Sequence, residues 1–217
     1  MMGHFITFEG PEGGGKSTHI RRLAERLRAC GQDVVVTREP GGTPLGEAIR
    51  NLLQHDAAGE PPVPRAEALL FCASRAQLVA TLVRPALARG AWVLSDRFAD
   101  STFAYQGSGR GFALDELRRV NAFATGGLTP DFTLLLDVDE PAGRLRLATR
   151  CGAGAAADRI EREPSDFHDR LRRGFLDLAR AEPDRFLVVP TGRPVDAVAA
   201  EIRGTVARRF AATLGRA

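Results

Sequence analysis

The chain has 217 residues, 44% of them hydrophobic and 26% charged, and this composition excludes a disordered or fibrous protein. At this length we expect one domain around one core rather than two full domains. The 30 basic and 27 acidic residues are mixed along the chain and leave a net charge of +3, which favours small anionic ligands over nucleic acid as partners. The three cysteines lack disulfide-framework or metal-ligand spacing, and no run approaches the roughly 18 apolar residues of a membrane helix. We therefore expect a cytoplasmic protein with no membrane partner.

Short apolar runs alternate with longer segments of helical spacing, a pattern typical of βαβ units around a parallel sheet. The helical segment over residues 18–30 is followed by Gly31, where a helix commonly ends. A longer helical segment over residues 65–89 contains Pro85, which we expect to kink it. Five apolar runs predict a five-stranded parallel sheet inside a three-layer α/β/α fold. The predicted strands are residues 5–8, 34–37, 92–94, 132–136 and 186–189.

The segment between the first strand and the first helix has the spacing of a phosphate loop: a glycine, four residues, then Gly-Lys-Ser. It reads Gly10-Pro11-Glu12-Gly13-Gly14-Gly15-Lys16-Ser17, and Thr18 follows. Glycines let backbone N–H groups converge on phosphate oxygens, and the helix N-terminus adds partial positive charge. We expect Lys16 to reach the β- and γ-phosphates of ATP and Ser17 to bind Mg²⁺. This motif predicts a nucleoside triphosphate site but does not identify the phosphate acceptor.

Charged residues follow the second and third predicted strands. Arg38 begins the segment R-E-P-G-G-T, and Asp96 and Arg97 lie in the segment S-D-R-F. Ligands of open α/β sheets bind beyond the carboxyl ends of strands, so these side chains are placed to meet an anionic substrate. We expect Asp96 to lie where the second acid of phosphate-loop enzymes holds Mg²⁺.

Two further groups could approach the acceptor, the first of them on the predicted long helix. Phe71 and Arg75 are four residues apart and therefore share one helix face, which could hold a planar base between a ring and a forked donor. Ser101, Tyr105 and Gln106 occur in the segment S-T-F-A-Y-Q-G, which follows the third predicted strand. Taken alone, each of these side chains could equally be core or solvated surface.

Together these segments, in this order and over nearly the whole chain, resemble the thymidylate kinase family. The resemblance implies a phosphate-loop NTPase fold of the nucleoside monophosphate kinase type, as a single domain over residues 1–217. It implies dTMP and ATP as substrates, dTDP and ADP as products, and a homodimer. No covalent intermediate is expected.

The resemblance also implies roles for individual residues. Phe71 would stack on thymine, and Arg75 would hydrogen-bond a ring carbonyl. Arg97 would contact the acceptor phosphate and the transferred phosphoryl group. Tyr105 would leave no room for a 2′-hydroxyl. Ser101 and Gln106 would approach the base and deoxyribose, and Glu9 would orient the acceptor sugar or the metal shell.

A lid is expected over about residues 149–162. The phosphate loop offers Glu12 at its variable positions, and a carboxylate cannot stabilise an anionic transition state. Positive charge must then come from elsewhere, and Arg150 and Arg159 resemble the lid arginines of the bacterial type. We expect Arg150 to act in catalysis and Arg159 to bind ATP, on a mobile segment that closes to exclude water.

Two alternatives stay open from the sequence. The chain could be a phosphate-loop kinase for another nucleotide, in which case Phe71, Arg75 and Tyr105 would be misassigned. It could instead be a phosphate-loop ATPase or switch protein, although we find no clear residue to position an attacking water.

Overall fold

The structure is a computed structural model that describes residues 3–55, 58–151, 159–160 and 162–214. Its described residues form a five-stranded, all-parallel sheet in the order β2-β3-β1-β4-β5. The strands are β1 (His4–Glu9), β2 (Val34–Arg38), β3 (Trp92–Asp96), β4 (Phe132–Asp137) and β5 (Phe186–Pro190). The five predicted strands and their parallel pairing are confirmed.

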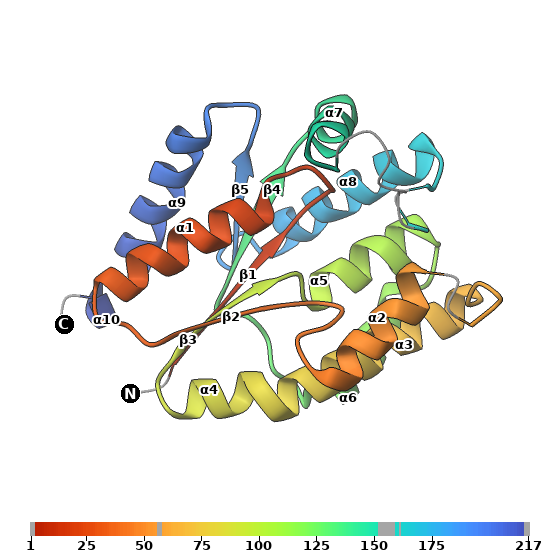
Figure 1. Ribbon diagram of the computed structural model, residues 1–217, viewed down its shortest axis with the longest axis horizontal. Coiled ribbons are helices and arrows are strands. Elements are labelled where there is room, and N and C mark those ends of the chain that lie inside the picture. Colours follow the sequence, from red (N-terminus) through yellow and green to blue (C-terminus); the bar gives the residue numbers. More distant parts are fainter. Residues whose placement is uncertain (1–2, 56–57, 152–158, 161, 215–217) are drawn as a thin grey trace.

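Helices cover both faces of the sheet, and the resulting layers are visible in Figure 1. Alternate residues of β1 supply the two faces: Ile6 and Phe8 pack in the core under α1 (Lys16–Ala29) and α9 (Val195–Arg209), whereas Phe5 packs on the opposite side. The short α10 (Ala211–Leu214) continues the first layer. The other elements are α2 (Pro44–Gln54), α3 (Pro64–Leu78), π-helical η1 (Val79–Val83), α4 (Arg84–Ala88), α5 (Ala99–Thr102), π-helical η2 (Phe103–Gly109), α6 (Leu114–Thr125), α7 (Glu140–Cys151) and α8 (Ser165–Ala181). The three-layer α/β/α architecture is confirmed.

The predicted long helix is present as α3, η1 and α4 in succession. Pro85 lacks an N–H and its ring would collide with the carbonyl four residues earlier in a regular helix. The wider π-helical turn of η1 immediately precedes it, which is a usual way to accommodate such a disturbance. By length and composition residues 64–88 could cross a membrane, but 44% of the most apolar window is buried inside the protein. Leu78, Val79 and Val83 pack against the sheet, so this is a core helix.

The strand register places the functional segments at one edge of the sheet. Phe8 of β1 and Arg38 of β2 both pair with Asp96 of β3. The phosphate loop, the R-E-P-G-G-T segment and Arg97 therefore all leave the sheet at neighbouring carboxyl ends. This is where ligands bind in open α/β sheets.

Candidate active site

The phosphate loop has the backbone geometry that its glycines allow. Gly13 and Gly15 have φ values of 74° and 86°, in the left-handed region that disfavours other residues. A Cβ on Gly13 would lie 2.3 Å from the Gly143 carbonyl oxygen, so α7 approaches the loop too closely for a side chain. Gly15 is also the N-cap of α1 and supplies no capping side chain, which leaves the N-terminal N–H groups of the helix uncapped, as in helix N-termini that bind phosphate.

Lys16 is the only lysine in the sequence and is buried at the start of α1. Its Nζ donates to the carbonyl oxygens of Gly10 and Pro11, at 3.0 and 2.9 Å. Burial, and then the nearby Arg97, lower the pKa of Lys16 below its usual value. The ammonium group is thus held by the loop's own carbonyls, within the curve that the glycines create.

Two oxygen ligands suited to a divalent cation meet beside the loop. The Ser17 hydroxyl donates to the Asp96 carboxylate at 3.0 Å, although 79 residues separate them in the sequence. Among the described residues no group of three or more His, Cys, Asp and Glu side chains could hold a metal alone. Mg²⁺ commonly uses one or two protein oxygens plus water and substrate phosphates, and this pair fits that requirement.

Arg97 connects the phosphate loop to the far side of the site. Its Nη1 donates to the Gly10 carbonyl at 3.1 Å and to the Ser101 hydroxyl at 3.2 Å, and its Nη2 pairs with Glu12. The guanidinium also lies over the Tyr105 ring, 5.0 Å from its centroid. Arg97 has a φ of 73°, and non-glycine residues in this region concentrate at functional sites because the strain must be held by surrounding contacts.

Glu12 binds Arg97 and Tyr105, two contacts that the sequence did not predict. It accepts hydrogen bonds from Arg97 and from the Tyr105 hydroxyl, the latter at 3.2 Å. Although burial opposes the shift, Arg97 and Lys16 lower the pKa of Glu12 to about 2. This carboxylate therefore stays ionised and orients Arg97 and Tyr105. No local signal in the sequence indicates the Arg97 contact, because the two residues are 85 positions apart.

Glu9 ends β1 on the side of the sheet away from α1 and is fully buried. Its carboxylate accepts hydrogen bonds from the Phe98 N–H at 2.7 Å and the Ser101 hydroxyl at 2.6 Å. Burial and the neighbouring Asp100 raise the pKa of Glu9 to about 8. Glu9 therefore holds a proton more tightly than an ordinary glutamate, and its carboxyl group supports the backbone that follows Arg97.

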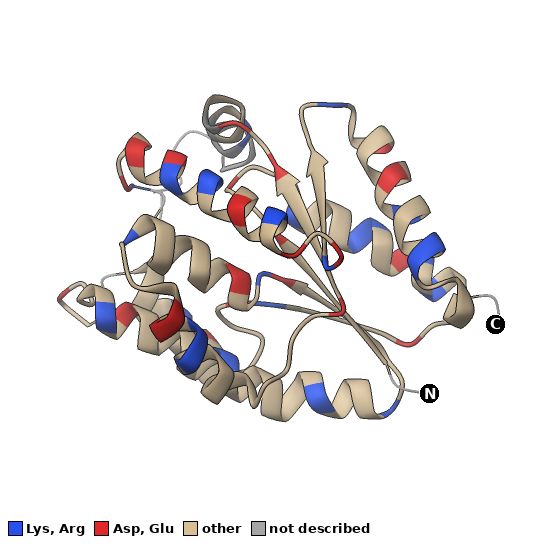
Figure 2. Cartoon of the chain, turned by 180° about the vertical axis from the view of Figure 1, so that it is seen from behind, with Lys and Arg blue, Asp and Glu red and all other residues tan. Residues whose placement is uncertain are grey.

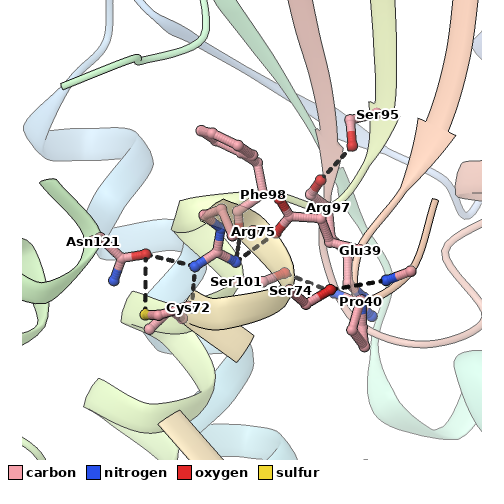
Figure 3. Close-up of polar contacts among 12 residues, drawn as sticks. Glu39, Pro40, Cys72, Ser74, Arg75, Ser95, Arg97, Phe98, Ser101 and Asn121 are labelled. Atoms are coloured by element: carbon pink, nitrogen blue, oxygen red, sulfur yellow. Dashed lines mark hydrogen bonds and ion pairs between the residues drawn. The ribbon is translucent and has the colours of Figure 1, made fainter. Parts of the chain in front are cut away.

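Arg75 is enclosed by protein groups and is only 1% exposed. Figure 3 shows its guanidinium between Glu39, Phe98 and Asn121. Its five N–H donors are engaged: by the Glu39 carboxylate at 2.8 and 2.6 Å, by the Phe98 carbonyl at 2.9 Å, by the Thr102 hydroxyl at 2.9 Å and by the Asn121 amide oxygen at 2.5 Å. The structure thus gives Arg75 a structural role, and its expected contact with thymine stays a prediction.

A cavity of about 330 Å³ lies between the phosphate loop and α3. It is lined by residues from every motif singled out in the sequence: Glu12, Gly13, Gly15, Lys16, Ser17, Thr18, Arg38, Phe71, Arg75, Asp96, Arg97, Ser101, Tyr105 and Gln106. Arg38 pairs with Glu47 of α2 through contacts of 2.9 and 3.0 Å and remains 55% exposed. The tertiary structure thus gathers the predicted nucleotide and acceptor residues around one space, within the usual volume range of ligand pockets.

Further residues line the same cavity without having been predicted, among them Arg50, Gln54 and Ile160. Arg50 could have been found, since it lies on the helix that follows the R-E-P-G-G-T segment. Ile160 lies within the predicted lid, but nothing local marks its apolar side chain as part of the cavity wall.

The predicted lid is only partly described. The Arg150 side chain, residues 152–158 and residue 161 lie outside the described part of the structure. Arg159 donates to Glu67 at 2.5 Å and to the Leu53 carbonyl at 3.1 Å, on the side of α2 and α3. Its expected contact with ATP, and a closing lid, stay predictions.

A second cavity of about 250 Å³ lies on the other side of the phosphate loop. Arg146 of α7 and Thr191, which follows β5, line it together with the first turn of α9. The Arg146 guanidinium donates to the Thr191 carbonyl at 2.7 Å. This space continues from the phosphate loop, away from the first cavity.

Comparisons with known proteins agree with this geometry. A sequence model of the family described as thymidylate kinase matches residues 8–202. The chain is 54% identical to a thymidylate kinase of Deinococcus radiodurans over 208 residues, which cover 96% of this chain and 98% of the relative. It is 53% identical to a thymidylate kinase of Clavibacter sepedonicus over 203 residues, covering 94% of each. A crystal structure of thymidylate kinase from Ehrlichia chaffeensis superposes with a TM-score of 0.77 at 33% identity, covering 95% of this chain and 99% of that one. The chain therefore belongs to the thymidylate kinase family of ATP-dependent nucleoside monophosphate kinases.

Proposed function

We propose that the protein transfers the γ-phosphoryl group of ATP to dTMP, that the 330 Å³ cavity holds dTMP, and that the phosphate loop holds ATP. One observation carries this assignment. The cavity is lined by the phosphate loop and by the acceptor-motif residues Phe71 and Gln106. Arg97 lines it as well, and its guanidinium contacts Gly10 and Glu12 of the loop and the Ser101 hydroxyl. A donor phosphate on the loop and an acceptor phosphate beside Arg97 would then be neighbours, which direct in-line transfer requires.

The acceptor phosphate would lie between Arg97 and Arg38. Arg97 is already oriented by Glu12, so its position costs little reorganisation when substrate binds. Arg38 is exposed and held by Glu47, and can exchange part of that pairing for a phosphate. Phe71 is half-buried on the cavity wall and would face the thymine ring. The buried Tyr105 closes the wall on the side of Glu12 and would exclude a 2′-hydroxyl.

The triphosphate would bind the N–H groups of the phosphate loop and of the first turn of α1. Lys16 would exchange its contacts with the Gly10 and Pro11 carbonyls for β- and γ-phosphate oxygens. The second cavity, beside Thr191 and Arg146, would receive adenine. Its position on the far side of the loop leaves the γ-phosphate directed toward Arg97.

Ser17 and Asp96 would hold Mg²⁺, which neutralises developing charge on the phosphates when bound. The protein itself supplies alignment and fixed positive charge from Lys16 and Arg97. Arg150 would add a further charge from the lid. No residue needs to bond covalently to the phosphoryl group.

We also propose a homodimer in the cytoplasm. Phe123 of α6 is 92% exposed and Leu69 of α3 is 58% exposed, while α3 and α6 pack against each other. Large apolar side chains exposed on adjoining helices are typical of an interface between subunits. A nucleic-acid partner is disfavoured, since the coloured ribbon of Figure 2 shows basic and acidic residues interspersed along the helices.

The test is ADP release with ATP and Mg²⁺, measured in parallel with dTMP, dUMP, ribo-TMP, dCMP, dGMP and no acceptor. We expect turnover with dTMP to exceed turnover with the other acceptors. Preference for another monophosphate would keep the transfer chemistry and overturn the roles of Phe71 and Tyr105. Hydrolysis independent of an acceptor would instead support the ATPase alternative.

A further inference from the structure

Glu67 lies in the first turn of α3, outside the predicted site, and its side chain is 2% exposed. Its carboxylate accepts hydrogen bonds from three residues. Gln106 donates at 3.0 Å, Arg110 donates twice at 3.3 Å, and Arg159 donates at 2.5 Å. One buried carboxylate thus joins η2, the turn after it and the chain that follows the undescribed residues 152–158.

The two arginines extend these contacts to other elements. Arg159 also donates from Nε to the Leu53 carbonyl at the end of α2, where a cation is favoured by the helix dipole. Arg110 pairs with Glu163 at 2.7 Å. Arg159 and Glu163 lie on either side of Ile160 in the sequence. Arg159 binds Glu67 directly, and Glu163 is linked to Glu67 through Arg110.

Ile160 is the residue placed by these contacts. It lines the 330 Å³ cavity and packs against the apolar cluster that includes Tyr105 and Phe167. The cation of Arg110 also lies over the Phe167 ring, 5.0 Å from its centroid. Ile160 thus forms part of the cavity wall, and the ion pairs of Glu67 with Arg159 and Arg110 hold its segment in place.

The charge of Glu67 is maintained by these partners. Although burial opposes the shift, the hydrogen bonds from Gln106, Arg159 and Arg110 lower the pKa of Glu67. At neutral pH the group is therefore a carboxylate facing two cations. Removing its charge would take the carboxylate from the partly buried Arg159 and leave Arg110 paired with Glu163.

We infer that Glu67 is a positioning residue for the acceptor pocket: it holds Ile160 against the cavity through Arg159 and Arg110, and it orients Gln106 toward the acceptor. The inference rests on the assignment of this cavity to dTMP. A positioning role differs from a purely structural role in its effect on the two substrates. A positioning residue of this cavity affects dTMP binding far more than ATP binding.

The test compares Glu67→Gln with wild type by steady-state kinetics and by titration calorimetry with dTMP alone. The glutamine has nearly the same shape but lacks the charge that binds the arginines. We expect KM and Kd for dTMP to rise about tenfold, equivalent to about 1.4 kcal/mol. KM for ATP should change less than about twofold, because the phosphate loop does not contact Glu67.

A matched control separates positioning from general destabilisation. Val206 of α9 is 1% exposed in the core on the opposite face of the sheet, so Val206→Ala should lower the melting temperature without changing KM for dTMP. Arg110→Gln is a second variant in a more exposed position, and the double variant with Glu67→Gln should lose less dTMP affinity than the two single losses combined.

Three results would overturn the inference: an unchanged KM for dTMP in both Glu67→Gln and Arg110→Gln, an equal rise in KM for both substrates, or the same rise in Val206→Ala. If Glu67→Gln does not fold, Arg110→Gln decides between the same outcomes. Failure of the wild-type protein to prefer dTMP would instead overturn the proposed function. The kinetics of the wild-type protein therefore distinguish failure of the proposed function from failure of this inference.

Discussion

Replacing Arg75 with methionine separates the structural role of this residue from the base-binding role implied by the family resemblance. The variant keeps much of the side-chain volume but removes all five donors of a group that is 1% exposed. Glu39 would be left 3% exposed without its cation, and the Phe98 carbonyl and Asn121 amide would each lose a donor. Breaking a buried ion pair by removing one partner costs about 3–5 kcal/mol.

For a chain of this size each kcal/mol shifts the melting temperature by about 2–4 °C, so we expect a loss of about 6–20 °C. Urea unfolding followed by the fluorescence of Trp92, the only tryptophan and a buried one, measures the free energy directly. Arg21→Met is the matched control, because Arg21 pairs with Glu25 while 67% exposed and should cost less than about 0.5 kcal/mol.

The double variant Glu39→Gln, Arg75→Met should be less destabilised than the two single losses combined, since no buried carboxylate is left uncompensated. A loss below about 1 kcal/mol in Arg75→Met would refute the structural reasoning. If such a stable variant also showed a raised KM for dTMP, Arg75 would be a ligand-binding residue alone.

Three further predictions concern the phosphate loop, the metal pair and Glu9. Lys16→Ala should lower kcat/KM by at least about 100-fold with an unchanged circular dichroism spectrum, and normal turnover would remove the role assigned to this lysine. Asp96→Asn should raise the Mg²⁺ concentration needed for half-maximal activity by about tenfold at saturating ATP, whereas an unchanged Mg²⁺ titration would contradict the assignment. Glu9→Gln should change the pH dependence of stability. Because burial and Asp100 raise the pKa of Glu9 from 4.5 to about 8, its contribution is complete below pH 4.5 and is lost as the pH rises through 8. The stability difference between wild type and Glu9→Gln should therefore fall between pH 5 and 8, and a constant difference across urea titrations would show that Glu9 is ionised throughout.

Much of the fold and many of the site residues could be predicted from local patterns. The five strands are short apolar runs, and the phosphate loop is a contiguous spacing of glycines ahead of a helix. The carboxyl ends of parallel strands must meet at one edge, which brings Arg38 and Asp96 together without further information. The sequence predicts a disturbed helix near Pro85 but not that the disturbance takes the form of a π-helical turn.

The strands and the phosphate loop could be inferred from the sequence because each depends on periodicity or spacing within one segment. The family could be inferred because several such segments occur in its order along the chain. The tertiary structure alone decided which charges pair. The partners of the main buried pairs lie far apart in the sequence: 85 positions for Glu12 and Arg97, 36 for Glu39 and Arg75, and 92 for Glu67 and Arg159. A carboxylate can pair with any of the many arginines in the chain, and only the packed fold, by burying some groups and excluding water around them, makes one partner far more favourable than the others.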